Sequence, residues 1–188
     1  MPLLVEKGSV LIDNGYQVVP ILPNKKYPGV RGWEQLNTTK DDLTKYASNG
    51  YARGGVGVLA KHTPGIDIDI LDSSIVDQVV DHVGGMLGEI MLRVGLPPKT
   101  LIPCQCNEPF TKVSSRVWVD FLGDRHKLEI LGDGQQWVAY GMHPDTGEPY
   151  QWGDGGVTSV PREELPVLDH TMAVEMVEWF EGQCPGWG

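Results

Sequence analysis

The chain has 188 residues, 40% apolar and 21% charged, which is enough for a domain with a sizeable hydrophobic core. Its 24 glycines and 14 prolines indicate many turns and short strands, and so exclude a helical bundle. A formal charge of −10 excludes nucleic-acid binding driven by overall electrostatic attraction, although basic residues could still line one groove.

The first 70 residues alternate helices with short strands. In chain order, the expected segments are a helix at 2–15, a strand at 16–22, a basic loop at 25–33, a helix at 41–48 and strands at 54–59 and 65–70. The first helix follows from the helical rhythm of its apolar residues and from the stop signal Asn14-Gly15. Thr39 is a possible cap of the second helix. The last two strands follow each other through a tight connection.

The rest of the chain predicts two more helices and three more strands. The expected segments are a helix at 73–87, a strand at 99–106, strands at 127–131 and 136–140, and a helix at 169–181. Asp72 or Ser73 can cap the first of these helices. Gly132-Asp133-Gly134 tolerates positive φ, so we expect the two strands around it to pair as a hairpin. We expect one domain over residues 1–188, and the abrupt end at Gly186-Trp187-Gly188 is typical of a piece excised from a longer protein.

Targeting and cysteine signals are weak. No apolar run approaches the roughly 20 residues that span a bilayer, and residues 1–19 lack the features of a signal peptide. We therefore expect a soluble, cytoplasmic protein. Cys104 and Cys106 have no second pair or histidine cluster at zinc-binding spacing, so reduced structural thiols are the expectation.

The strand at 65–70 alternates apolar with acidic residues. Successive side chains of a strand point to opposite faces at about 3.3 Å per residue, so Asp67 and Asp69 share a face about 6.6 Å apart. Two like charges side by side are costly unless water or a cation neutralises them. Such oxygen ligands suit Mg²⁺ or Mn²⁺ and can support phosphoryl transfer. The alternative explanation is an edge strand with a polar outer face.

The strand at 127–131 offers a third carboxylate. Glu129 has the same apolar neighbours as the aspartates and could meet them from an adjacent strand. Lys127 shares its face and could pair with the acidic group or contact a phosphate. His126 falls on the opposite face, so it could join the acidic group only through a bulge, and a surface histidine is the competing interpretation.

Three other groups each have two interpretations. The basic residues of the 25–33 loop could guide template or primer phosphates, or could simply be solvated. His143 lies in a turn-rich loop, where it could be functional or structural. Tyr150 and Trp152 could stack on a base, although strand aromatics more often belong to the core.

Four segments, in this order, resemble the primase-polymerase domains of phage, plasmid and mobile-element replication proteins, within the archaeo-eukaryotic primase superfamily. They are Gly15-Tyr-Gln-Val-Val-Pro with Lys-Tyr-Pro-Gly and Gly32-Trp33, Gly55-Val-Gly-Val, Gly65-Ile-Asp-Ile-Asp, and the stretch from Leu128-Glu-Ile-Leu-Gly-Asp-Gly to Trp152. Together they cover roughly residues 10–152. The resemblance implies an α/β fold with an RRM-like catalytic core, in which a mixed or antiparallel sheet carries the acids and helices flank it.

The resemblance also implies the roles of the acids. In that family an Asp-x-Asp strand and a later acidic strand residue hold the catalytic metal ions. This carries over to Asp67, Asp69 and Glu129 as the catalytic and metal-binding residues, with Mg²⁺ or Mn²⁺ as cofactor.

The family's Ser-x-His motif, which contacts the triphosphate of the incoming nucleotide, has no clean match here. The corresponding stretch offers basic residues without a histidine. We therefore expect the substrate-binding residues to be Arg93, Lys99, Lys112, Lys127 and His143.

The leading prediction is a template-directed nucleotidyltransferase, a DNA primase/polymerase in the replication of a phage, plasmid or mobile element. Its partners would be a single-stranded DNA template, dNTPs or NTPs, and a helicase domain on the full-length protein, with no membrane. Two alternatives remain open: a metal-dependent nuclease, because clustered carboxylates also serve hydrolysis, and a catalytically degenerate replication module that binds nucleic acid.

Overall fold

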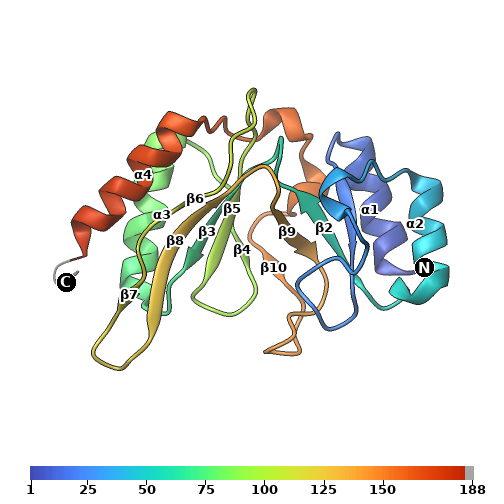
Figure 1. The fold of residues 1–188 in the computed structure, drawn as a ribbon, viewed down its shortest axis with the longest axis horizontal. Coiled ribbons are helices and arrows are strands. Elements are labelled where there is room, and N and C mark those ends of the chain that lie inside the picture. Colours follow the sequence, from blue (N-terminus) through green and yellow to red (C-terminus); the bar gives the residue numbers. More distant parts are fainter. Residues whose placement is uncertain (185–188) are drawn as a thin grey trace.

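The structure, a computed structural model, describes residues 1–184. Two antiparallel sheets lie side by side, and helices flank each of them (Figure 1). This confirms the expected mixed α/β architecture. The expectation of a piece excised from a longer protein depends on Gly186-Trp187-Gly188, and this segment lies outside the described residues.

The larger sheet carries the Asp-x-Asp strand near its centre. Its strand order is β10 (Gln151–Trp152), β4 (Arg93–Val94), β5 (Thr100–Pro103), β3 (Gly65–Asp69), β8 (Arg125–Leu131) and β6 (Val113–Ser114), and β7 (Trp118–Val119) also pairs with β8. Helices α3 (Ser73–Leu87) and α4 (His170–Gln183) pack on one face of this sheet. Ile66 and Ile68 of β3 and Leu128 of β8 are fully buried there, so the opposite face is left to the polar residues of both strands.

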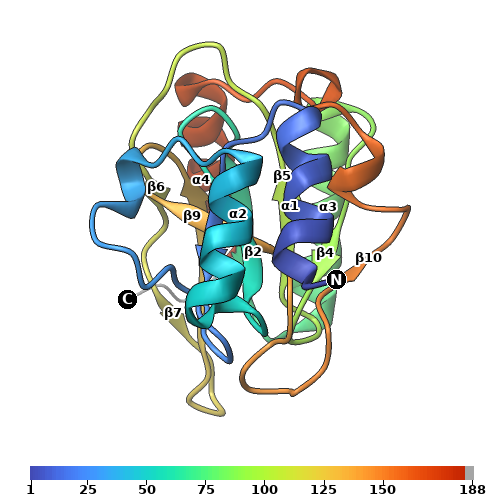
Figure 2. The ribbon, with the colours of Figure 1, turned by 90° about the vertical axis from the view of Figure 1, so that its right-hand side faces the viewer.

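The smaller sheet has the strand order β1 (Val18–Ile21), β2 (Gly55–Leu59) and β9 (Gln136–Tyr140). Helices α1 (Leu3–Asp13) and α2 (Lys40–Tyr46) lie side by side against it, as Figure 2 shows. Leu4 and Leu43 of these helices pack in one cluster with Val56 and Val58 of β2. Thr39 caps α2 in a reciprocal capping box with Asp42, as its position suggested.

Short helical turns complete the structure. They are η1 (Trp33–Gln35), η2 (Ala47–Tyr51), η3 (Val157–Ser159) and η4 (Arg162–Glu164). The expected helix at 41–48 passes into η2 after Tyr46, and the expected strand at 99–106 ends at Pro103. Cys104 and Cys106 beyond it are buried free thiols, as expected.

The predicted hairpin of strands 127–131 and 136–140 is wrong. The second strand, β9, pairs with β2 in the smaller sheet, whereas β8 pairs with β3 in the larger one. The β2–β3 and β8–β9 connections each cross from one sheet to the other. The segment that contains β2 and β3 therefore runs antiparallel to the segment that contains β8 and β9 in both sheets. Around the turn, the Asp133 amide donates to the Phe110 carbonyl at 2.7 Å and the Ala60 amide to the Gln135 carbonyl at 3.0 Å. These hydrogen bonds hold the β8–β9 connection as it passes from the larger sheet to the smaller one, so the two strands do not pair as a hairpin.

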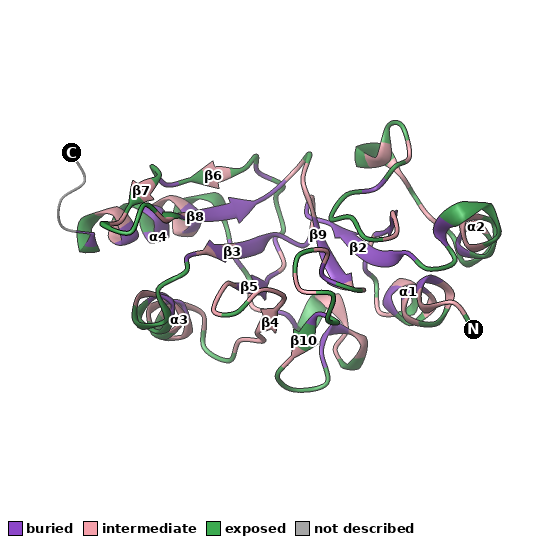
Figure 3. Ribbon diagram, turned by 90° about the horizontal axis from the view of Figure 1, so that it is seen from below, coloured by how far each residue is buried: buried purple, intermediate pink, exposed green. Residues whose placement is uncertain are grey.

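Buried residues concentrate in the central strands of both sheets, whereas exposed residues lie mainly on the helices and the outer loops (Figure 3). Within the described chain, no helix is long and apolar enough to cross a membrane.

Candidate active site

The acidic residues meet on one face of the larger sheet. In the antiparallel pairing of β3 with β8, Asp67 stands directly opposite Glu129, and Asp69 stands opposite Lys127. The neighbouring Leu128 is fully buried on the other face, against the helices. The strand alternation expected from the sequence is therefore confirmed, and it brings three carboxylates from two strands onto one surface.

Lysine side chains neutralise two of these carboxylates. Lys99 Nζ lies 2.7 Å from Asp69 Oδ1, while Lys112 Nζ and Lys127 Nζ lie 3.1 and 3.0 Å from Glu129 Oε1. Burial by itself would raise the pKa of Glu129, but the hydrogen bonds from the two lysines outweigh it and hold the pKa below its usual range. Glu129 is therefore ionised at neutral pH.

Within residues 1–184, Asp67 has no ion pair with a lysine. Burial raises its pKa to about 6; among the nearby charges, that of Arg93 lowers the pKa most, those of Asp69 and Glu129 raise it, and that of Lys127 lowers it slightly. Ionising such a buried carboxyl group costs free energy, and a cation beside it would lower that cost.

The donor set fits a hard divalent cation by its chemistry, because it consists of three carboxylates on one surface. As the side chains lie, however, no group of three His, Cys, Asp or Glu residues within residues 1–184 is close enough to hold a metal ion. The amino groups of Lys99, Lys112 and Lys127 lie beside two of the carboxylates instead. A metal ion would have to displace these lysines from Asp69 and Glu129.

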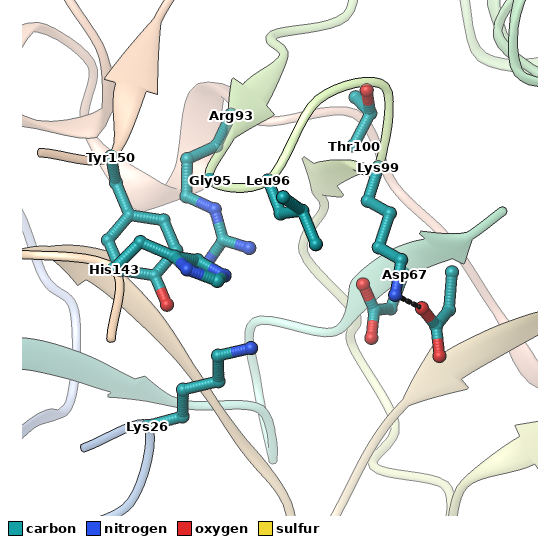
Figure 4. Close-up of a pocket in the computed structure, with 10 residues that line it drawn as sticks. Lys26, Asp67, Arg93, Gly95, Leu96, Lys99, Thr100, His143 and Tyr150 are labelled. Atoms are coloured by element: carbon teal, nitrogen blue, oxygen red, sulfur yellow. Dashed lines mark ion pairs between the residues drawn. The ribbon is translucent and has the colours of Figure 1, made fainter. Parts of the chain in front are cut away.

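A pocket of about 230 Å³ opens beside the aspartates, between the two sheets (Figure 4). Its polar lining combines Asp67 and Asp69 with Lys26, Arg93, Lys99, Thr100, His143 and Tyr150. These residues come from the basic loop, β3, β4, β5 with the connection between them, and the loop after β9. The pocket therefore holds Lys99 beside the aspartates, together with the cations Lys26 and Arg93.

A sequence model of the family described as bifunctional DNA primase/polymerase, N-terminal (Prim-Pol), matches residues 9–167. The chain belongs to this family. A search of curated proteins found no significant match. Family membership gives this Prim-Pol domain a function of the DNA primase/polymerase type.

Arg93 is one of the residues that line the Prim-Pol pocket. Its Nη1 donates to the carbonyl of Val138, and its guanidinium carbon lies 4.6 Å from the ring centroid of Tyr150. Its buried Nε finds no hydrogen-bond acceptor in the described part of the chain. Arg93 is thus held by a strand carbonyl and an aromatic ring, while its buried Nε–H has no partner within residues 1–184.

His143 and Lys26 reach the same pocket from different loops. His143 is buried, stacks at a tilt on Tyr150 with ring centroids 5.3 Å apart, and accepts the Asp145 amide N–H through Nδ1 at 3.2 Å. Burial lowers the pKa of His143, so the ring is neutral at pH 7 and Nε2 carries its proton. Lys26 pairs with Asp145 at 3.2 Å.

The structure divides the expected substrate-binding residues. Arg93, Lys99 and His143 line the pocket, whereas Lys112 and Lys127 lie on Glu129 and do not line it. Lys26 was not in this set; with Lys25 and Arg31 of the same loop it was expected only as a possible contact for template or primer phosphates. The only signal for it was its place in the most basic loop of an acidic chain, and no local pattern indicates that this loop faces β3.

His126 is neither part of the acidic group nor a surface residue. It is 1% exposed, its Nδ1 accepts the amide of Leu71 at 3.1 Å, and its Nε2 lies 2.9 Å from Asp120 Oδ2. The expectation of a surface histidine is therefore wrong, because Asp120 and the Leu71 amide supply the polar partners that allow the ring to be buried.

Proposed function

We propose that this Prim-Pol domain is a template-directed nucleotidyltransferase whose acidic centre consists of Asp67, Asp69 and Glu129. The observation that carries the proposal is the direct pairing of Asp67 with Glu129 beside a pocket with a cationic wall. Polymerisation needs both features, because carboxylates hold the metal ions and cations hold the triphosphate.

The three carboxylates would hold Mg²⁺ or Mn²⁺. When bound, the metal lowers the pKa of the attacking 3′-hydroxyl and neutralises charge on the phosphoryl group being transferred. The raised pKa of Asp67 supports its place in this set, because a carboxyl group that is strained when charged gains most from a cation.

The incoming nucleotide would place its triphosphate in the pocket. Arg93 and Lys99 would contact phosphate oxygens, with Lys26 and the Nε2 proton of His143 as further donors. At about 230 Å³ the pocket is smaller than the roughly 300–1,000 Å³ typical of whole-ligand sites, so it fits the polyphosphate and leaves the base outside.

Lys99 would couple metal binding with nucleotide binding, because it would leave Asp69 when a metal binds there. In the structure the Lys99 amino group pairs with Asp69 at 2.7 Å. A cation on Asp69 would repel that amino group, which could then contact a phosphate in the same pocket. Metal and nucleotide should therefore bind cooperatively.

The proposed partners are a single-stranded DNA template and dNTPs or NTPs. A role in replicating a phage, plasmid or mobile element, with a helicase domain on the full-length protein, rests on the family resemblance and belongs to the proposal.

The test is extension of a labelled primer on a DNA template with Mn²⁺ and nucleotides. Asp67→Asn and Asp69→Asn should each lower incorporation by at least about a hundredfold, whereas Asp81→Asn, an exposed acid on α3, should leave it unchanged. Incorporation that survives both substitutions would refute the acidic centre. Shortening of the DNA without nucleotides, lost in the same variants, would show a nuclease instead.

A further inference from the structure

The connection between β7 and β8 exposes large apolar side chains. Phe121 is 96% and Leu122 73% exposed, and Val117 and Val119 of the preceding segment are also exposed. Figure 1 shows this hairpin reaching beyond the rest of the larger sheet, at the end away from α1 and α2. Grouped apolar exposure of this kind marks an interaction surface more often than isolated exposed residues do.

The hairpin is internally ordered. Asp120 Oδ1 accepts the amide N–H groups of Leu122 at 2.8 Å and Asp124 at 3.0 Å, and its Oδ2 lies 2.9 Å from the buried His126. The Trp118 ring packs against the His126 ring with centroids 4.9 Å apart. The tip is therefore held in place before any ligand arrives, which lowers the entropic cost of binding.

The apolar tip continues the surface that carries the acidic centre. Val119 pairs with Arg125 across β7 and β8, so the two side chains share a face. Along β8, Arg125, Lys127 and Glu129 alternate with buried residues and lie on that same face. At about 3.3 Å per residue, Arg125 lies roughly 13 Å from Glu129 along the strand.

We propose that this surface, defined by Val119, Phe121, Leu122, Arg125 and Lys127, binds a nucleic-acid strand at the acidic centre. The phosphates would contact Arg125, with Lys127 as a further donor beside its ion pair with Glu129, and the bases would stack on Phe121 and pack against the aliphatic side chains. At about 3.4 Å per stacked nucleotide the surface covers roughly four nucleotides. The inference deepens the proposed function by placing the template or primer strand.

Charge and position favour nucleic acid over a protein partner. The chain has a formal charge of −10, yet the outward-facing residues of β8 that lead to Glu129 are the exposed Arg125 and the half-buried Lys127, which pairs with Glu129. A polyanion gains chiefly from the Arg125 cation, and base–aromatic stacking adds about 1–3 kcal/mol per base. The surface also ends at the carboxylates that would act on the strand.

Binding without catalysis tests the proposal. The probe is a fluorescein-labelled single-stranded oligonucleotide of about 12 nucleotides, measured by anisotropy in EDTA at low salt. Phe121→Ser with Leu122→Ser should weaken binding about tenfold, and Arg125→Ala several-fold. Val10→Ala removes an exposed apolar side chain from α1, at the far end of the molecule, and should have no effect.

Melting temperatures should stay unchanged in these variants, because the replaced side chains are exposed. Phe121→Ser alone, at the most exposed of these positions, provides a second readout if the double variant is destabilised. Unchanged DNA affinity in folded Phe121→Ser and Arg125→Ala proteins overturns the proposal. So does a concentration-dependent dimer that the Phe121 substitution abolishes while DNA affinity stays the same.

The outcome can be separated from that of the proposed function. Asp67→Asn should bind the oligonucleotide in EDTA at least as tightly as the parent chain, because it removes a negative charge. If tip variants lose DNA affinity while the parent chain fails to incorporate nucleotides, the binding surface stands and the proposed catalysis fails. If incorporation depends on Asp67 while the tip variants bind DNA as tightly as the parent chain, the proposed catalysis stands and the binding surface fails.

Discussion

At the residue scale, the three carboxylates of the proposed centre are not equivalent. Asp69 and Glu129 have lysine partners, whereas Asp67, directly opposite Glu129, has a pKa raised to about 6 by burial. The folded protein therefore holds a proton on Asp67 more tightly than the unfolded chain does. Stability from that proton is fully present below about pH 4 and is lost as the pH rises through 6.

Asp67→Asn should stabilise the metal-free protein at neutral pH. The amide removes the cost of a buried charge, so the free energy of unfolding at pH 7.5 should rise by about 1–3 kcal/mol, and the gain should disappear near pH 4. Urea unfolding in EDTA across this pH range measures it. Asp69→Asn is the matched control, because it breaks the ion pair with Lys99 and should bring no gain. Equal effects of the two substitutions would contradict this account of Asp67.

Two lysines near the centre should differ in their effect on nucleotide binding. Lys99 lines the pocket, whereas Lys112 contacts Glu129 outside it. Lys99→Ala should weaken the apparent affinity for nucleotide about tenfold or more, and Lys112→Ala should change it less than threefold. Thermal shift with a nucleotide and Mn²⁺ measures both variants. A larger loss in Lys112→Ala would place the triphosphate beside Glu129 rather than in the pocket.

At the element scale, the two crossings between the sheets position the site. The β2–β3 and β8–β9 connections run beside each other, and the Ala60 amide donates to the Gln135 carbonyl between them. As a result β3 and β8 present their acids on the larger sheet, while the smaller sheet brings the β1 loop and the segment after β9 over the pocket. Lys26 and His143 reach Arg93 in this way.

Gly132→Ala should disturb these crossings. A Cβ at Gly132 would lie 2.1 Å from the carbonyl oxygen of Phe110, which is backbone and cannot move aside as a side chain can. We expect a loss of about 2 kcal/mol or more in the free energy of unfolding, with a lower apparent metal affinity because β8 shifts. Gly153→Ala, where a Cβ meets nothing within 4 Å, is the control and should change stability by less than about 1 kcal/mol. Equal free energies of unfolding for the two variants would show that the backbone at the crossing can shift to make room for the added Cβ.

At the scale of the whole molecule, a formal charge of −10 coexists with a function of the DNA primase/polymerase type. In the proposed function, phosphates contact only the cations of the pocket and of β8. Electrostatic attraction should therefore be local, with few phosphates contacted.

The salt dependence of DNA binding should be shallow. With two to four phosphates neutralised, a single strand should give a slope of log K against log salt of roughly −1.4 to −2.8. Anisotropy titrations between 50 and 200 mM salt measure this slope, and Arg125→Ala should reduce its magnitude by about 0.7. A slope steeper than roughly −5 would require a basic surface beyond the residues of β8 and the pocket.

The sequence by itself predicted the helices, the strand at 65–70 and the face of each acid. These features depend on local periodicity: strands alternate every two residues, so Asp67 and Asp69 could be assigned to one face of their strand, and Glu129 to the same face as Lys127 in its own strand, before any strand pairing was known. The fold class and the family followed from the order of such segments, and the match over residues 9–167 confirmed the family.

The tertiary structure alone decided which strands pair and which loops meet. Local turn chemistry at Gly132-Asp133-Gly134 favoured a hairpin, but hydrogen bonds from distant residues carried β9 into the other sheet. His126 could be buried only because Asp120 and the Leu71 amide meet it. Contacts of this kind join residues far apart in the chain, and no local pattern encodes the distance between Lys26, Arg93 and His143 that makes them one pocket.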